Sequence, residues 1–187
     1  MPSGPGVIAE TQIAKIIAAV PPGTDTFLLT SATTAEAIIA QHQRCPASTI
    51  QLVDAVPMDT YPTLRAALPE VRLVQVIHVV DATALREAEA VASHVDAVLL
   101  DSGNPNLAVK SLGGTGQAHD WRISRRIVEA MDLPVWLAGG LRAHNVAEAI
   151  ATVQPYGVDL CTGVRTQGRL DEAKLSAFMA AVASVPN

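Results

Sequence analysis

The regular alternation of short apolar runs with amphipathic segments limits most strongly what this chain can fold into. Six apolar runs predict strands at residues 26–30, 49–53, 72–80, 96–100, 134–138 and 157–161. Helical spacing of apolar residues follows each run, at 34–42, 61–68, 83–93, 121–131, 145–153 and 171–183, and a further helix at 9–20 precedes the first strand. Near-continuous apolar strands alternating with helices indicate a parallel sheet covered on both faces. The predicted fold class is therefore α/β.

Composition sets the size and the chemistry of the core. The chain has 187 residues, of which 49% are hydrophobic and only 3% aromatic. This length suits a single domain, residues 1–187, with a core built from Val, Leu, Ile and Ala. The strand pattern fits a doubly wound sheet or a TIM barrel. Because no glycine fingerprint follows the first strand, a dinucleotide-binding fold has little support.

Charge, hydropathy and cysteine spacing exclude several classes of function. The net charge is −5 without a basic run, which argues against a nucleic-acid partner. No apolar run approaches the roughly 20 residues of a membrane span, and the N-terminus lacks a signal pattern. Cys45 and Cys161 lie far apart and form no metal or redox motif. We expect a cytoplasmic protein without a metal, a nucleic-acid partner or a membrane partner.

One carboxylate stands where barrels place their chemistry. The strand at 96–100 leads directly into Asp101, and a long loop follows. In α/β barrels the active site lies at the carboxyl ends of the strands, and burial there would raise the pKa of an acid. We expect Asp101 to act in catalysis; the alternative is that it only orders the loop. The glycine-rich segment of that loop is expected to cover a substrate, or else to be a mobile surface loop: Gly113, Gly114, Thr115 and Gly116.

Two further turns resemble an anion site. Gly139 and Gly140 follow the strand at 134–138, and Thr162 and Gly163 follow the strand at 157–161. Backbone amides without intervening side chains suit a phosphate, and many barrels bind phosphate after their last strands. The predicted phosphate site therefore consists of these four residues, with tight strand-to-helix turns as the alternative interpretation.

Other titratable residues near strand ends have weaker signals. His78 lies in an apolar run, which is more typical of a core histidine than of a residue in catalysis. Asp54 follows another strand. His119 and Asp120 precede the helix at 121–131, where we expect a helix-entry residue and an N-cap.

Four segments together resemble one enzyme family. They are LLDS (99–102), GGTGQAHDW (113–121), PVWLAGGLRAHNVAEAI (134–150) and PYGVDLCTGV (155–164). Their order and spacing resemble the phosphoribosylanthranilate isomerase family of tryptophan biosynthesis, an aromatic amino acid pathway. The resemblance implies an eight-stranded barrel and a cofactor-free Amadori rearrangement of N-(5-phosphoribosyl)anthranilate, an aldose–ketose isomerisation of a phosphorylated sugar. It also implies that Asp101 is the general acid and that the glycine turns hold the phosphate.

The chain departs from the family pattern in its first part. The family's general base is a cysteine in a Lys-Ile-Cys-Gly run on the first strand, and this chain has no such run. It also has QLVD (51–54) in place of Gln-Leu-His-Gly, and Cys161 in place of serine. By the resemblance, the first strand-helix-strand portion is absent and about six of the eight βα units remain.

Three explanations for the incomplete barrel stay open: a longer protein, a second chain that covers the gap, or a reduced open barrel. A homodimer covering the open barrel edge is the form of self-association we expect. For function, the prediction is a phosphoribosylanthranilate isomerase-like enzyme. The alternatives are a non-catalytic phosphate-binding barrel and an isomerase acting on another sugar phosphate. His78 and Asp54 are the two candidate bases if the chain is an enzyme that acts on another sugar phosphate.

Overall fold

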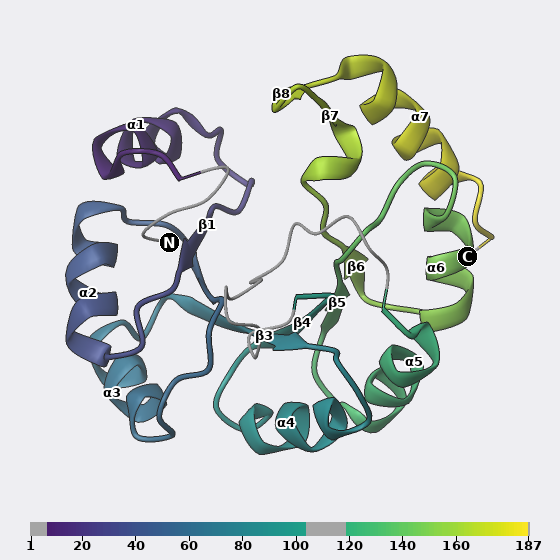
Figure 1. Ribbon diagram of the computed structural model, residues 1–187. Helices are drawn as coiled ribbons and strands as arrows, with labels where there is room; N and C mark the ends of the chain where they lie inside the picture. The colour runs from purple at the N-terminus through teal and green to yellow at the C-terminus, as the bar shows by residue number, and fades with distance from the viewer. Residues whose placement is uncertain (1–6, 104–118, 187) are drawn as a thin grey trace. The chain divides into compact units, whose positions relative to one another are not determined.

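The computed structural model describes residues 7–103 and 119–186 (Figure 1). The chain divides into two compact units. Unit 1 runs to Val76 and includes residues 93–96, whereas unit 2 contains residues 77–92 and those from Ala97 onward. The strands follow chain order in a parallel sheet, β1-β2-β3-β4-β5-β6. The predicted α/β class and its six successive parallel strands are confirmed.

Unit 1 contains three helix-strand steps. Its strands are β1 (Phe27–Thr30), β2 (Thr49–Leu52) and β3 (Arg72–His78), the last two residues of β3 belonging to unit 2. Its helices are α1 (Glu10–Ala19), α2 (Ala35–Arg44) and α3 (Thr60–Ala67). Every residue of β2 is buried, which explains why its sequence shows no polar alternation.

A buried polar network ties the end of β2 to β3 within unit 1. The Tyr61 hydroxyl on α3 donates to Gln75 Oε1 at 2.8 Å. The Gln75 amide donates in turn to the carbonyl oxygens of Leu52 (3.2 Å) and Asp54 (3.1 Å). Gln75 is only 2% exposed and Tyr61 is 1% exposed. Protein partners therefore satisfy both side chains, as buried polar groups require.

Unit 2 contains the end of β3, then α4 and the elements that follow it. Its strands are β4 (Ala97–Asp101), β5 (Val135–Leu137) and β6 (Gly157–Val158). Its helices are α4 (Thr83–Val91), α5 (Trp121–Ala130), α6 (Val146–Val153) and α7 (Glu172–Ala183). Figure 1 shows α4, α5 and α6 on the same side of these strands. The strand ends on which the sequence analysis centred lie in this unit.

Two predicted strands end at least two residues earlier in the structure than the sequence suggested. β3 ends at His78 rather than at residue 80, and the expected strand 157–161 is reduced to β6. Cys161 has φ −131° and ψ −68°, which is not extended, and a 3₁₀ turn, η1 (Thr162–Val164), follows it. An antiparallel hairpin of β7 (Arg165–Thr166) and β8 (Arg169–Leu170) comes next, which the sequence analysis did not predict.

Within the described residues, no helix combines the length and the apolar character that crossing a membrane requires.

Candidate active site

Asp101 is the last residue of β4, and its side chain is held in a nearly buried position. All five residues of β4 are buried, and Asp101 itself is 8% exposed. Its main-chain carbonyl accepts from Val79 N at 2.9 Å, which fixes the strand end. Its Oδ1 accepts from the backbone N–H of Ser102 at 2.8 Å, and Oδ2 has no protein hydrogen-bond partner among the described residues.

Burial raises the pKa of the Asp101 carboxyl above its ordinary value. The hydrogen bond from Ser102 and the nearby charge of His78 act in the opposite direction, but they do not cancel the effect of burial. A carboxyl group with a raised pKa keeps its proton to higher pH, which is the property that a general acid needs.

The glycine turn after β5 packs directly against the end of β4. Gly139 and Gly140 have φ values of 85° and 66°, a conformation that favours glycine. A Cβ at Gly139 would lie 2.6 Å from the Ser102 Oγ and 2.7 Å from the Ser102 N. Glycine is therefore needed at position 139 both for its backbone angle and for this close approach.

The turn after β6 approaches the glycine turn after β5 in the same way. Gly163 lies in η1, and a Cβ there would lie 2.1 Å from the Leu141 carbonyl oxygen. Only a residue without a side chain permits this contact. The two turns are thereby brought together, and their backbones face a shared space.

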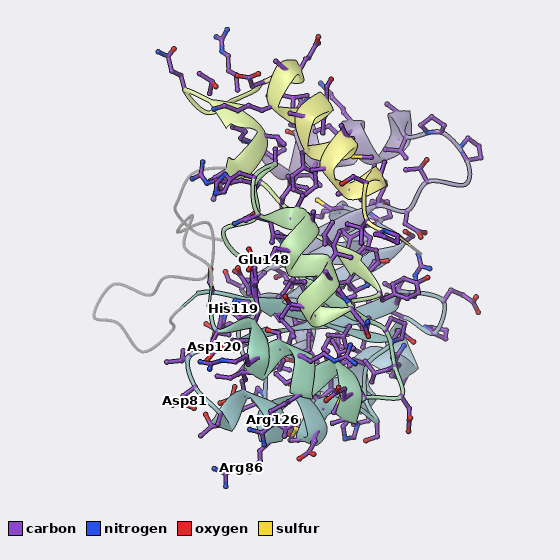
Figure 2. All side chains as sticks on the ribbon, turned by 90° about the vertical axis from the view of Figure 1, so that its right-hand side faces the viewer. Asp81, Arg86, His119, Asp120, Arg126 and Glu148 are labelled. Atoms are coloured by element: carbon purple, nitrogen blue, oxygen red, sulfur yellow. The ribbon has the colours of Figure 1, made fainter. Side chains whose placement is uncertain are left out.

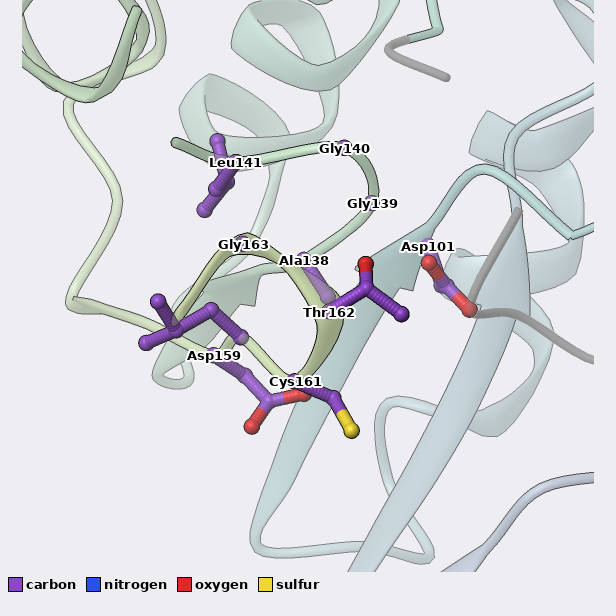
Figure 3. Close-up of a pocket in the computed structure, with 10 residues that line it drawn as sticks. Asp101, Ala138, Gly139, Gly140, Leu141, Asp159, Cys161, Thr162 and Gly163 are labelled. Atoms are coloured by element: carbon purple, nitrogen blue, oxygen red, sulfur yellow. The ribbon is translucent and has the colours of Figure 1, made fainter. Parts of the chain in front are cut away.

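One pocket brings together the five described residues that the sequence analysis assigned to acid and phosphate roles (Figure 3). They are Asp101, Gly139, Gly140, Thr162 and Gly163. They come from the ends of three strands that are well separated in sequence, so the sheet topology is what brings them together. The predicted loop residues Gly113, Gly114, Thr115 and Gly116 lie outside the described residues.

Two further pocket residues were not assigned to the predicted site: Asp159 was missed, and Cys161 was noted only as standing in place of the family's serine. Asp159 and Cys161 also line the pocket, and Cys161 carries an exposed free thiol. Figure 3 shows the carboxylates of Asp101 and Asp159 to either side of the Thr162 side chain. The surrounding protein desolvates Asp159, and the like charge of Asp101 adds to that effect, so the pKa of Asp159 is raised. The apolar pattern predicts that Asp159 lies inside a strand, whereas in the structure Asp159 directly follows the end of β6.

The remaining candidates have other surroundings. His78 is buried, 8% exposed, and does not line the pocket, although its charge acts on Asp101. Asp54 lies in unit 1, where its Oδ1 accepts from Ala55 N at 3.0 Å. In the described part of the chain, no group of three or more His, Cys, Asp or Glu residues is arranged to hold a metal ion.

His119 and Asp120 lie at the start of α5 (Figure 2). Asp120 is the N-cap of this helix, as predicted, and its side chain accepts from Arg122 N at 3.0 Å. His119 Nε2 lies 2.6 Å from the buried Ser124 Oγ. Burial lowers the pKa of His119 to about 4 despite the nearby Asp120 charge. His119 is therefore neutral at pH 7, and its contact with Ser124 stabilises the beginning of α5.

Comparison with known proteins identifies one family. Residues 5–181 match the family model for N-(5'phosphoribosyl)anthranilate (PRA) isomerase. The N-(5'-phosphoribosyl)anthranilate isomerase of Haloferax volcanii is 39% identical over 178 residues, which cover 95% of this chain and 76% of that protein.

Solved structures of this enzyme have the same fold. The isomerase of Pyrococcus furiosus has a TM-score of 0.76 and 25% identity, covering 95% of this chain and 82% of its own. Another, in complex with reduced 1-(o-carboxyphenylamino)-1-deoxyribulose 5-phosphate, has a TM-score of 0.75 at 19% identity, with coverage of 94% and 80%.

Proposed function

The chain belongs to the N-(5'-phosphoribosyl)anthranilate isomerase family, and we propose that its unit 2 pocket performs the family's aldose–ketose rearrangement with Asp101 as general acid. A single observation carries this proposal. The nearly buried Asp101 and two glycine turns line the same pocket in a chain that matches the family over residues 5–181.

The glycine turns are proposed to bind the substrate phosphate. Gly139, Gly140 and Gly163 present backbone without side chains, and Thr162 adds a hydroxyl at the same pocket. Backbone N–H groups and a hydroxyl are suitable donors for phosphate oxygens. Binding the phosphate at one end of the pocket would hold the sugar ring between the turns and Asp101.

Asp101 is proposed to open the sugar ring. Its carboxyl gives a proton to the ring oxygen while the C1–O bond breaks and the lone pair of the anthranilate nitrogen forms a C=N bond. Loss of the C2 proton then gives an enolamine, which tautomerises to the aminoketose. The raised pKa of Asp101 supports the first step, because it increases the fraction of the carboxyl that carries a proton.

The second step needs a base, and we propose Asp159. Besides Asp101, the described pocket residues that can accept a proton are Asp159 and Cys161. Since the family usually has serine at the position of Cys161, a thiol there is not required. A carboxylate with a raised pKa is a better proton acceptor than an ordinary one, which favours Asp159. We expect Asp159→Asn to slow turnover at least tenfold and Cys161→Ser to retain it.

The assay is the loss of phosphoribosylanthranilate fluorescence on addition of the purified chain. We expect turnover by the wild type and a decrease of about 10²–10⁴-fold in Asp101→Asn, the range typical of a lost general acid. Binding of inorganic phosphate should be unchanged in the variant. Equal turnover in Asp101→Asn would reject Asp101 as the acid. A folded wild type that binds phosphate without turnover would reject the activity itself.

Two further proposals concern the domain organisation and the cellular location of the chain. We propose that both units belong to one barrel domain, which the family match across residues 5–181 supports. A cytoplasmic location is consistent with the free thiols of Cys45 and Cys161.

We further propose that the chain forms a homodimer. In unit 1, α1 has no buried residue and Leu29 of the terminal strand β1 is 46% exposed, so apolar surface is available for association. Light scattering during size-exclusion chromatography should give twice the chain mass. A monomer at all concentrations would contradict this assembly.

A further inference from the structure

Asn145 occupies the N-cap position of α6 but does not cap this helix. An asparagine at an N-cap normally accepts a hydrogen bond from a backbone N–H in the first turn of its helix. Here the Asn145 side chain makes no such bond. It turns back toward the preceding loop, so hydrogen bonds to that loop replace the usual hydrogen bond of an N-cap to its own helix.

The side-chain amide of Asn145 bridges two points of the glycine turn after β5. Its Oδ1 accepts from Arg142 N at 2.7 Å, and its Nδ2 donates to the Gly140 carbonyl at 3.1 Å. The amide thus uses both its acceptor and its donor on the same loop. Gly140 is one of the pocket residues, so the bridge acts directly on the pocket backbone.

The residue between these two anchor points connects the bridge to the other half of the pocket. Leu141 lies between Gly140 and Arg142, and its side chain is 2% exposed. Its carbonyl oxygen is the atom that a Cβ at Gly163 would approach to 2.1 Å. Holding Gly140 and Arg142 therefore also fixes Leu141, against which the Gly163 turn rests.

We infer that Asn145 is a positioning residue that sets the spacing of the two glycine turns for binding a phosphoryl group. The inference rests on the proposed phosphate site and assigns its preorganisation to one side chain outside the pocket lining. Preorganised donors bind an anion more tightly because no ordering is needed on binding. Without the bridge, the turns keep their sequence but lose their fixed separation.

The variant Asn145→Ser separates positioning from capping. Serine is as good an N-cap as asparagine, but its short side chain cannot span Gly140 and Arg142 together. We expect the thermal midpoint to change by less than about 3 °C, and the dissociation constant for inorganic phosphate to rise about tenfold. KM for phosphoribosylanthranilate should rise by a similar factor, with kcat changing by less than about threefold. The matched control is His144→Ala, an exposed neighbour that should leave all of these values unchanged.

The outcomes distinguish this inference from the proposed function. Phosphate binding is followed by amide chemical shifts of Gly139 and Gly140 in the full chain. If these amide shifts give the same phosphate affinity for the wild type and for Asn145→Ser, the positioning role is rejected. If phosphate does not shift these amides in the wild type, the proposed phosphate site itself is rejected. A large loss of stability together with equal losses of kcat and affinity would show a merely structural role.

Discussion

The two units both place polar side chains near the carboxyl ends of parallel strands, but they satisfy them differently. In unit 1, Gln75 exchanges hydrogen bonds with Tyr61, Leu52 and Asp54, so its amide is fully used by the protein. In unit 2, the described residues give the Asp101 side chain one hydrogen bond, from the backbone N–H of its neighbour Ser102. Both side chains are nearly buried, at 2% and 8% exposure. Hydrogen-bond completion, rather than burial, distinguishes the structural network from the pocket.

The largest effect on ligand binding should follow from a substitution that fills the close approach in the pocket backbone. In Gly139→Ala, the new Cβ would lie within 2.8 Å of three atoms of Ser102, and the backbone angle would also be strained. We expect the dissociation constant for inorganic phosphate, measured by calorimetry, to rise at least about tenfold, or about 1.4 kcal/mol. Gly168→Ala is the matched control, because Gly168 has a similar φ of 78° with nothing within 4 Å. Equal losses of affinity in both variants would show that the close approach is unimportant.

His119 is an intermediate case, since it has one partner, Ser124, while its buried Nδ1 has none among the described residues. Its pKa of about 4 lies below the ordinary value of about 6.5, so the unfolded chain binds a proton more readily than the folded chain. The contribution to stability is therefore complete above pH 6.5 and is lost as the pH falls toward 4.

Urea titrations at pH 7 and pH 4 give the free energy of unfolding and test whether it falls with pH as described. Between pH 7 and pH 4, His119 should lower the free energy of unfolding of the wild type by up to about 3 kcal/mol. In His119→Gln this contribution is absent, so the free energy of unfolding should fall correspondingly less. His144→Gln, at an exposed position, controls for the general effect of removing a histidine. Identical pH dependence in wild type and His119→Gln would contradict the assignment.

The smallest effect on activity is expected from removing a hydrogen bond of the unit 1 network. Tyr61→Phe removes the donor to Gln75 Oε1 and leaves a buried acceptor unsatisfied. We expect the free energy of unfolding to fall by about 2 kcal/mol, with KM and kcat unchanged. Tyr156→Phe, which alters a 71% exposed side chain, should change neither stability nor kinetics. A loss of turnover in Tyr61→Phe at full stability would place this network in the function and remove the contrast between the units.

The strands and the pocket residues around Asp101 were predictable because their signals are local. Continuous apolar runs identify buried strands, and the acid and glycines that follow them mark strand ends. The position of Asp159 was not predictable in this way. Its neighbours Val158 and Leu160 are apolar, so the pattern extends the strand beyond its true end at Val158.

Other features depend on backbone angles or on side-chain direction. The β7–β8 hairpin turns at Gln167 and Gly168, with φ values of 50° and 78°. Gln is not among the residues that typically signal such a turn, so the sequence gives little warning of it. Likewise, an Asn before an apolar helix predicts an N-cap, and only the structure shows that Asn145 binds the preceding loop.

The proton affinity of Asp101 tests the central claim most directly. Carboxyl ¹³C chemical shifts of the labelled chain, followed from pH 2 to pH 8, report the pKa of Asp101 without requiring substrate. The account predicts a pKa above the ordinary aspartate value of about 3.9 for Asp101, and a lower pKa for Asp159 in Asp101→Asn, because the like charge of Asp101 is removed. An Asp101 that titrates at or below the ordinary value in the wild type would contradict its role as the general acid.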